Sequence, residues 1–229
     1  MVYFGFVVGI VAGNIAAHAA HVDALRVYVA TLVLIPAGLI GAKLLYVFSH
    51  WPLYRHNPRR IWDPSQGGAA QYGGLALVLP LSLPLLAALG LSFGAFWDVA
   101  VFTILLVMIF GRVGCLMNGC CAGRPSRSWI TLYLPNRSGV WDRRIPTQCL
   151  ETGLAAVLLI CAIVLRRSLP FPGALFLLVA AGYAAGRLVL ESTRESQAGV
   201  RRFTIHHAIS LLTILSSLTA VIARWAKVH

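Results

Sequence analysis

Long apolar stretches, each close to the length of a membrane-spanning helix, alternate with polar connections along the chain. A helix needs about 20 residues to cross the hydrocarbon core of a bilayer. The pattern therefore predicts seven spans, at residues 2–22, 27–48, 73–92, 96–117, 148–165, 172–190 and 204–223. We expect an all-α integral membrane protein with seven transmembrane helices and a small polar head region between spans four and five. Residues 1–229 are expected to form a single membrane-embedded domain.

The polar connections differ in length. Because the number of spans is odd, the connections at 49–72, 118–147 and 191–203 lie on one side of the membrane. These are the long connections, and they carry tryptophan and arginine, whereas the others are short. Functional residues are often carried by long loops on a rigid scaffold, so function is expected on the long-loop side.

The composition supports a membrane protein with an anionic partner. Hydrophobic residues make up 59% of the chain and charged residues 11%, whereas about 25% of the residues of a soluble domain are charged. The net charge of +12 comes mostly from arginine, and basic membrane proteins usually meet anionic lipid head groups. Since no soluble nucleic-acid-binding module is recognisable, no nucleic-acid partner is expected. The N-terminal MVYFGFVVGI has no basic region and no cleavage site, and is interpreted as a first span.

Five ionisable residues fall within or just beyond the predicted spans, all at the long-loop side: Lys43, Arg112, Glu151, Arg187 and Glu191. Charged side chains at this depth are costly and usually face a protein-lined cavity, where they pair with one another. The i, i+4 spacing places Arg187 and Glu191 on one helix face. Snorkelling or a structural ion pair explains each residue singly, but their convergence on one level favours a site. Asp98, at the opposite side, is interpreted as a structural first-turn carboxylate.

The stretch GRVGCLMNGCCAGR, residues 111–124, gathers much of this chemistry. Guanidinium groups bind phosphodiester oxygens in a bidentate way, and Arg112 and Arg187 are the candidates for holding such a group. The glycines of the stretch would let a ligand approach the backbone, and close helix packing explains them equally well. They are Gly111, Gly114, Gly119 and Gly123.

Three of the five cysteines, Cys115, Cys120 and Cys121, lie in the same stretch. Electropositive surroundings lower a thiol pKa and raise its reactivity. Three interpretations stay open: small apolar fillers or a structural disulfide, a covalent nucleophile that relays a transferred group, and a redox or metal role. The spacing matches no recognised zinc pattern, so no metal ligands are assigned. Cys149 lies near the same level as a further disulfide candidate, and Cys161 is expected in the core.

Four further segments accompany this stretch: IGAKLLYV (40–47), GGAAQYGGL (67–75), IPTQCLE (145–151) and GRLVLESTRE (186–195). In their order, and at the ends of the spans, the five segments resemble the motifs of prolipoprotein diacylglyceryl transferases. These membrane enzymes move diacylglyceryl from phosphatidylglycerol to a lipobox cysteine. The resemblance covers most of the chain. It implies a transferase of the bacterial inner membrane that acts in lipoprotein biosynthesis, releases glycerol phosphate and needs no cofactor and no metal ion.

The resemblance also implies roles for individual residues and for partners. Its catalytic set is Arg112, Arg187, Tyr72 and Glu191. Its substrate-binding set is Lys43, Gly73, Gly114, Cys115, Asn118, Gly123, Arg124, Gln148 and Glu151. The implied partners are phosphatidylglycerol, a lipobox-containing protein or another thiol acceptor, and the membrane.

Four positions depart from the family pattern. The family has asparagine, glutamate, histidine and arginine where this chain has, in that order, Cys115, Cys120, Tyr72 and Lys43. One alternative is therefore a transferase of the same fold with a different donor or acceptor, which uses Cys115, Cys120 and Cys121 directly. The other is a non-enzymatic anion transporter or a redox or metal carrier.

Two arguments predict opposite orientations in the membrane. Basic residues outside the spans are more numerous on the long-loop side, and the positive-inside rule would place that side in the cytoplasm. The family resemblance implies that the site faces the periplasm. Because a site for anionic lipid recruits arginines for function, the periplasmic orientation is preferred.

Overall fold

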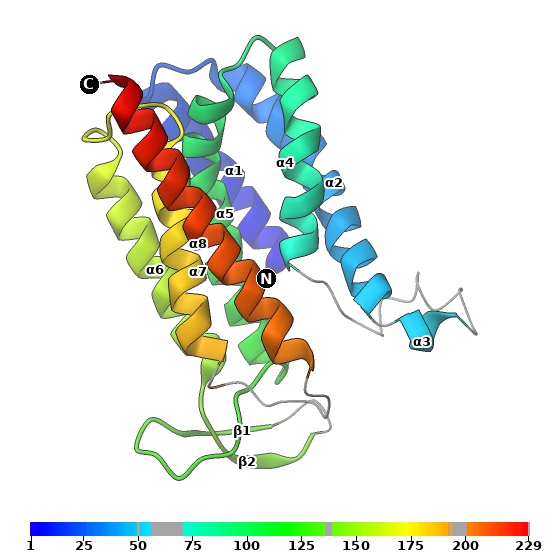
Figure 1. The fold of residues 1–229 in the computed structure, drawn as a ribbon. Coiled ribbons are helices and arrows are strands. Elements are labelled where there is room, and N and C mark those ends of the chain that lie inside the picture. The colour runs from blue at the N-terminus through cyan, green and yellow to red at the C-terminus, as the bar shows by residue number, and fades with distance from the viewer. Residues whose placement is uncertain (50, 56–70, 136–138, 192, 194–200, 229) are drawn as a thin grey trace.

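The computed structural model describes residues 1–49, 51–55, 71–135, 139–191, 193 and 201–228, and within them seven long helices pack side by side (Figure 1). They correspond to the seven predicted spans, with ends that differ by a few residues. A four-residue helix, α3 (Trp51–Tyr54), follows the second of them. The long helices are α1 (Val2–Ala19), α2 (Ala24–Ser49), α4 (Gln71–Ala88), α5 (Phe93–Met117), α6 (Thr147–Leu165), α7 (Ala174–Glu191) and α8 (Arg201–Val228).

The surface of the bundle is that of a membrane protein. Five helices, α1, α2, α5, α6 and α7, are long and apolar enough to cross a bilayer. α4 and α8 contain shorter apolar stretches, Gly73–Ala88 and Ser210–Ala223. Large apolar side chains point outward, with Val7 61% exposed and Ile160 62% exposed, as expected where lipid covers the protein. The prediction of an all-α multi-pass membrane protein is confirmed.

Small residues let several helix pairs approach closely. α1 packs on α5, α2 on α4, and α8 on α7. A Cβ atom added to Gly9 of α1 would lie 2.9 Å from the Thr103 carbonyl oxygen of α5. A Cβ atom on Gly73 would overlap the Gly41 carbonyl oxygen of α2. The glycine at position 73 is therefore explained by helix packing, which small residues serve in membrane bundles.

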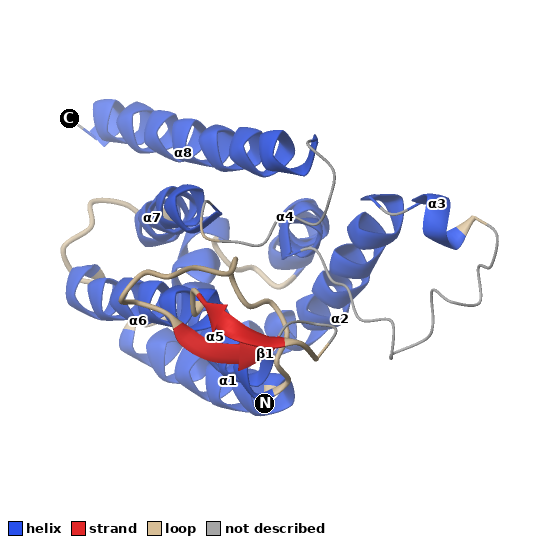
Figure 2. Cartoon of the chain, turned by 90° about the horizontal axis from the view of Figure 1, so that it is seen from below, coloured by secondary structure: helices blue, strands red, loops and turns tan. Residues whose placement is uncertain are grey.

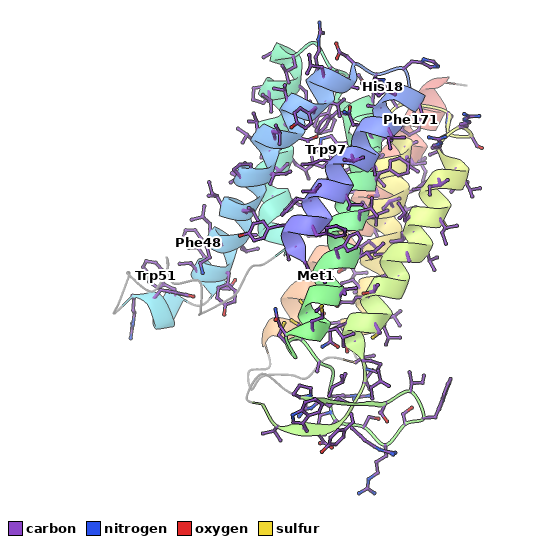
Figure 3. The ribbon with its side chains drawn as sticks, turned by 180° about the vertical axis from the view of Figure 1, so that it is seen from behind. Met1, His18, Phe48, Trp51, Trp97 and Phe171 are labelled. Atoms are coloured by element: carbon purple, nitrogen blue, oxygen red, sulfur yellow. The ribbon has the colours of Figure 1, made fainter. Side chains whose placement is uncertain are left out.

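At one end of the bundle, Asp98 anchors the start of α7. Its carboxylate accepts hydrogen bonds from the backbone N–H groups of Gly173, at 2.6 Å, and Phe176, at 2.9 Å. Both donors lie at the N-terminus of α7, where backbone N–H groups have no partner within the helix. The structural interpretation of Asp98 is therefore supported, but its placement in a first turn was wrong, because α5 begins five residues earlier, at Phe93, and Asp98 caps another helix. Figure 3 shows Trp97 and Phe171 toward the same end of the bundle.

The other end carries a small β-hairpin that the sequence analysis did not predict. Strand β1 (Leu132–Pro135) pairs in antiparallel fashion with β2 (Trp141–Arg144). The hairpin lies across the end of the bundle at which α5 ends and α6 begins (Figure 1 and Figure 2). The expected head region therefore contains a two-stranded sheet. Aromatic and β-branched residues in two neighbouring runs of the sequence, ITLYLP and GVWDRR, were the available signal.

Candidate active site

Glu151, in the first turns of α6, connects the ionisable residues of three helices. Its carboxylate contacts Arg112 Nε from α5 and Arg187 Nη1 from α7. Arg187 Nη2 lies 3.4 Å from Glu191 Oε2, one turn further along α7. Glu151 is only 2% exposed. A buried carboxylate between two guanidinium groups is compensated in charge, whereas either partner alone would be costly to bury. The predicted pairing of Arg187 with Glu191 is confirmed.

The two arginines of this network use their nitrogens differently. Arg187 has one terminal nitrogen on each of two carboxylates, and its side chain is 8% exposed. Arg112 binds Glu151 through Nε, and its side chain is 17% exposed. The ion pair places Nε on Glu151, and the guanidinium group of Arg112 ends in two further nitrogens that carry N–H donors. Next to it, a Cβ atom on Gly111 would meet nothing within 4 Å, so space is open beside α5 at this level.

Backbone hydrogen bonds join three of the sequence segments just beyond the network. The Gly123 N–H donates to the Ile145 carbonyl oxygen at 3.0 Å, and the Arg124 N–H donates to the Thr193 carbonyl oxygen at 3.0 Å. The hydroxyl groups of Thr147 and Thr193 lie 3.2 Å apart. The ends of α5, α6 and α7 are thus tied together, which fixes the spacing of the charged residues that they carry.

The glycines divide into two groups. A Cβ atom on Gly123 would lie 2.5 Å from Thr147 Oγ1 and 2.6 Å from two carbonyl oxygens, and a Cβ atom on Gly114 would lie 3.0 Å from Met1 Cβ. Close packing therefore explains both. Gly119 has a φ of +63°, which glycine adopts at little cost, and it begins the turn that follows α5. Gly111 is the one with open space beside it among these four glycines.

The remaining predicted site residues differ in how closely they join the network. Gln148, 2% exposed on α6, donates from Nε2 to the Cys120 carbonyl oxygen at 2.7 Å. The side chains of Asn118 and Arg124 are exposed, and Lys43 is half-buried on α2. The side chain of Tyr72 lies outside the described residues.

The three thiols of Cys115, Cys120 and Cys121 form a three-cysteine cluster. Their sulfur atoms all lie within 4.8 Å of one another, and none of the three forms a disulfide with another described cysteine. Burial and the neighbouring Cys121 raise the pKa of the Cys120 thiol, so the expectation that nearby arginines lower it is wrong for this residue. Cys161, expected in the core, is exposed on α6, because the middle of that helix faces outward there.

Two polar residues of the site, a buried arginine and a half-buried threonine, were not predicted. Arg144, at the end of β2, is 4% exposed and donates from Nη1 to the Gly123 carbonyl oxygen at 3.4 Å. Thr193 links α7 to both Arg124 and Thr147. Arg144 directly precedes the segment IPTQCLE, and Thr193 lies within the segment GRLVLESTRE. Their positions along the chain were therefore the available signal.

The fold and the charged network together define a multi-pass membrane protein with a buried arginine–carboxylate site at the hairpin end of its helix bundle. The chain belongs to the prolipoprotein diacylglyceryl transferase family, whose model matches residues 1–223.

Individual relatives agree with this assignment. A phosphatidylglycerol–prolipoprotein diacylglyceryl transferase of Dehalococcoides mccartyi is 32% identical over 172 residues. The match covers 73% of this chain and 65% of the length of that relative. Proteins of the same name from Bacillus mycoides and Listeria monocytogenes are 29% and 28% identical, each over 204 residues. These matches cover 84% and 85% of this chain, and 74% and 73% of the relatives.

Proposed function

We propose that residues 1–229 act as one transferase domain that moves diacylglyceryl from phosphatidylglycerol to the cysteine thiol of a lipoprotein precursor. The observation that carries the proposal is the geometry of Arg112. A buried carboxylate holds its Nε, and in this proposal the two terminal nitrogens bind the anionic ligand. A guanidinium fixed in this way is suited to bind two oxygens of a phosphodiester at once.

The donor lipid would bind with its phosphodiester at Arg112 and its acyl chains along the outer surface of the bundle. Open space beside Gly111 supports this placement. Gln148 supports it too, because its Oε1 is buried and accepts no hydrogen bond from the described part of the chain. Such an unmet acceptor suits a hydroxyl group of the glycerol head group. The exposed side chains of Asn118 and Arg124 lie in the same stretch and would contact the head group from outside.

In the reaction, the acceptor thiol loses its proton to solvent, and the thiolate sulfur attacks the glyceryl carbon. The bond between that carbon and the phosphate ester oxygen breaks, and the electron pair stays on the oxygen. The products are a thioether and glycerol phosphate. Arg112 would stabilise the negative charge that develops on the leaving group, the kind of interaction that contributes most to many enzymatic rates.

Arg187 and Glu191 would act mainly by positioning Glu151, and through it Arg112. Both terminal nitrogens of Arg187 already contact carboxylates, so it is poorly placed to give a bidentate contact to a phosphate. Gly73, Gly114 and Gly123 would support the site by holding helices and turns together, in line with their close contacts.

The direct test uses the purified protein with vesicles of phosphatidylglycerol and a synthetic lipobox peptide. We expect release of glycerol phosphate and a gain in peptide mass that equals one diacylglyceryl group. A peptide with serine in place of the lipobox cysteine should give no product, and phosphatidylcholine vesicles should support none. Absence of product, in a preparation that is folded by thermal melting, would contradict the proposed activity.

The site is proposed to face the periplasm, in the cytoplasmic membrane of a bacterium. The α8 end of the chain lies at the far end of the bundle from the hairpin (Figure 1). With the site outside, a tag fused after His229 should resist protease added to spheroplasts and become accessible only after lysis. A tag within the hairpin turn should show the opposite behaviour. A C-terminal tag that is cleaved in intact spheroplasts would overturn this orientation.

A further inference from the structure

The three-cysteine cluster has no role in the reaction described so far. Cys115 lies in the last turn of α5, and Cys120 and Cys121 lie in the turn that follows. Their sulfur atoms lie within 4.8 Å of one another. Around a tetrahedral zinc ion, with Zn–S bonds of about 2.3 Å, sulfur atoms stand about 3.8 Å apart. Small side-chain rotations would therefore bring the three sulfurs to the distances that one metal ion requires.

The backbone of this turn brings the sulfurs together. Cys121 has a φ of +62°, in the left-handed region that residues other than glycine rarely adopt. Such a conformation costs about 1–3 kcal/mol and persists where the surroundings hold it, often at functional sites. Here the Cys120 N–H donates to the Cys115 carbonyl oxygen at 3.0 Å, and buried Gln148 binds the Cys120 carbonyl oxygen at 2.7 Å. The geometry of the turn is thus held from both α5 and α6.

A positive charge lies close to the cluster. Arg112 interacts electrostatically with Cys115 and with Cys121. Three thiolates and one divalent ion carry a net charge of −1, which a neighbouring guanidinium complements. Sulfur ligands select soft or borderline ions such as Zn²⁺ and Cu⁺ over Mg²⁺ or Ca²⁺. Among the described residues, no fourth histidine, cysteine, aspartate or glutamate joins the group. A bound ion would therefore keep an open coordination position, as catalytic zinc sites do.

We propose that Cys115, Cys120 and Cys121 form a three-thiolate site for a zinc-like metal ion, whose open position takes the thiol of the acceptor. Binding of the ion releases three thiol protons to solvent and involves no change of oxidation state. The second part rests on the proposed transfer reaction. An acceptor thiol that coordinates the ion loses its proton, and its sulfur is then a metal-bound thiolate next to the phosphate-binding guanidinium of Arg112. After the sulfur attacks the glyceryl carbon, the product is a neutral thioether, which is a weak ligand and leaves the ion.

This role would explain how a thiol is activated without an obvious base. At the position where the family has histidine, this chain has Tyr72, and an unperturbed tyrosine hydroxyl, with a pKa of about 10, is a poor base at neutral pH. A metal ion lowers the pKa of a bound thiol directly and needs no neighbouring base.

The experiment measures metal binding by itself, apart from transfer. The full-length protein in detergent, kept reduced with a phosphine, is titrated with Co²⁺ and then with Zn²⁺. We expect one Co²⁺ per chain, with the near-ultraviolet absorption of a sulfur-to-cobalt charge transfer, and loss of that absorption when Zn²⁺ is added. The triple variant Cys115→Ser, Cys120→Ser, Cys121→Ser should bind none. The single variant Cys121→Ser, at an exposed thiol, should bind at least about tenfold more weakly.

Two further cysteines provide matched controls. Cys149→Ser and Cys161→Ser change exposed thiols outside the cluster and should leave metal binding unchanged. Adding the lipobox peptide should shift the Co²⁺ spectrum, whereas the peptide with serine should not.

The metal site is overturned if the wild type binds no ion, if the triple variant binds as well as the wild type, or if intact mass under these conditions shows a disulfide. An unchanged spectrum with the cysteine peptide overturns the acceptor role. Transfer activity without metal binding would contradict the metal site and leave the proposed function standing. Metal binding without transfer would contradict the proposed function and leave the metal site standing.

Discussion

Glu151→Gln is expected to lower the rate of diacylglyceryl transfer by at least about 100-fold, and to destabilise the protein by about 3 kcal/mol or more. The carboxylate is 2% exposed and lies between Arg112 and Arg187. Glutamine has nearly the same shape, but it carries no charge and cannot compensate two guanidinium groups. The two arginines would then repel each other in a buried place, and Arg112 would lose the contact that aims it.

The measurement is transfer by the purified variant, together with its thermal unfolding midpoint in the same detergent. Glu191→Gln is the matched comparison, because Glu191 contacts only one of the two arginines, at 3.4 Å, and its side chain is 13% exposed. Its loss of stability should be clearly smaller than that of Glu151→Gln. Equal stability losses for the two variants would show that Glu151 is not the centre of the network.

The helices were predictable because their signal is local. Each span is a long apolar stretch, and an apolar stretch in a bilayer has to satisfy its backbone groups within its own helix. The hairpin was missed for the opposite reason. Its strands are four residues long, and strands of that length carry too few alternating positions to stand out against a polar loop.

The residues of the site were predictable from the sequence, but the contacts between them were not. Arg187 and Glu191 are four residues apart on one helix, so their pairing follows from helix geometry. The contacts of Glu151 with Arg112 and Arg187 join residues of different helices, and no spacing along one sequence indicates which helix faces which. The same limit applies to the cysteines. Sequence spacing showed no metal pattern, whereas the left-handed backbone at Cys121 brings the three sulfurs together.

The ion pairs of the site give its two arginines different roles. Arg187 is enclosed by two carboxylates, and such a guanidinium mainly orients its partners. Arg112 shares one carboxylate through a single nitrogen and is more exposed. Replacing either arginine should impair the enzyme, but the two should differ in what is lost. Loss of Arg187 should act through stability and alignment, and loss of Arg112 should act on the chemical step.

Arg112→Lys is the variant that isolates this step. Lysine keeps the positive charge, but it offers a point charge in place of two parallel N–H groups, and it has no Nε to bind Glu151. We expect kcat for transfer from phosphatidylglycerol to fall by about 100- to 1,000-fold, as when one donor to a developing oxyanion is removed. For Arg112→Ala, kcat should fall further. Arg127→Ala, which removes an exposed arginine of the hairpin region, should stay within about threefold of the wild type, since isolated surface charges contribute little.

The split between kcat and KM decides what Arg112 does. A residue that only recruits anionic lipid would raise KM when it is changed to lysine and leave kcat unaltered, because it would bind donor and transition state equally. If the residue stabilises the leaving phosphate, its replacement by lysine lowers kcat with little change in KM. Measurement of initial rates over a series of phosphatidylglycerol mole fractions in mixed micelles separates the two. An Arg112→Lys enzyme with wild-type kcat would refute the assignment of Arg112 to the leaving group, and would leave it as a lipid-recruiting residue.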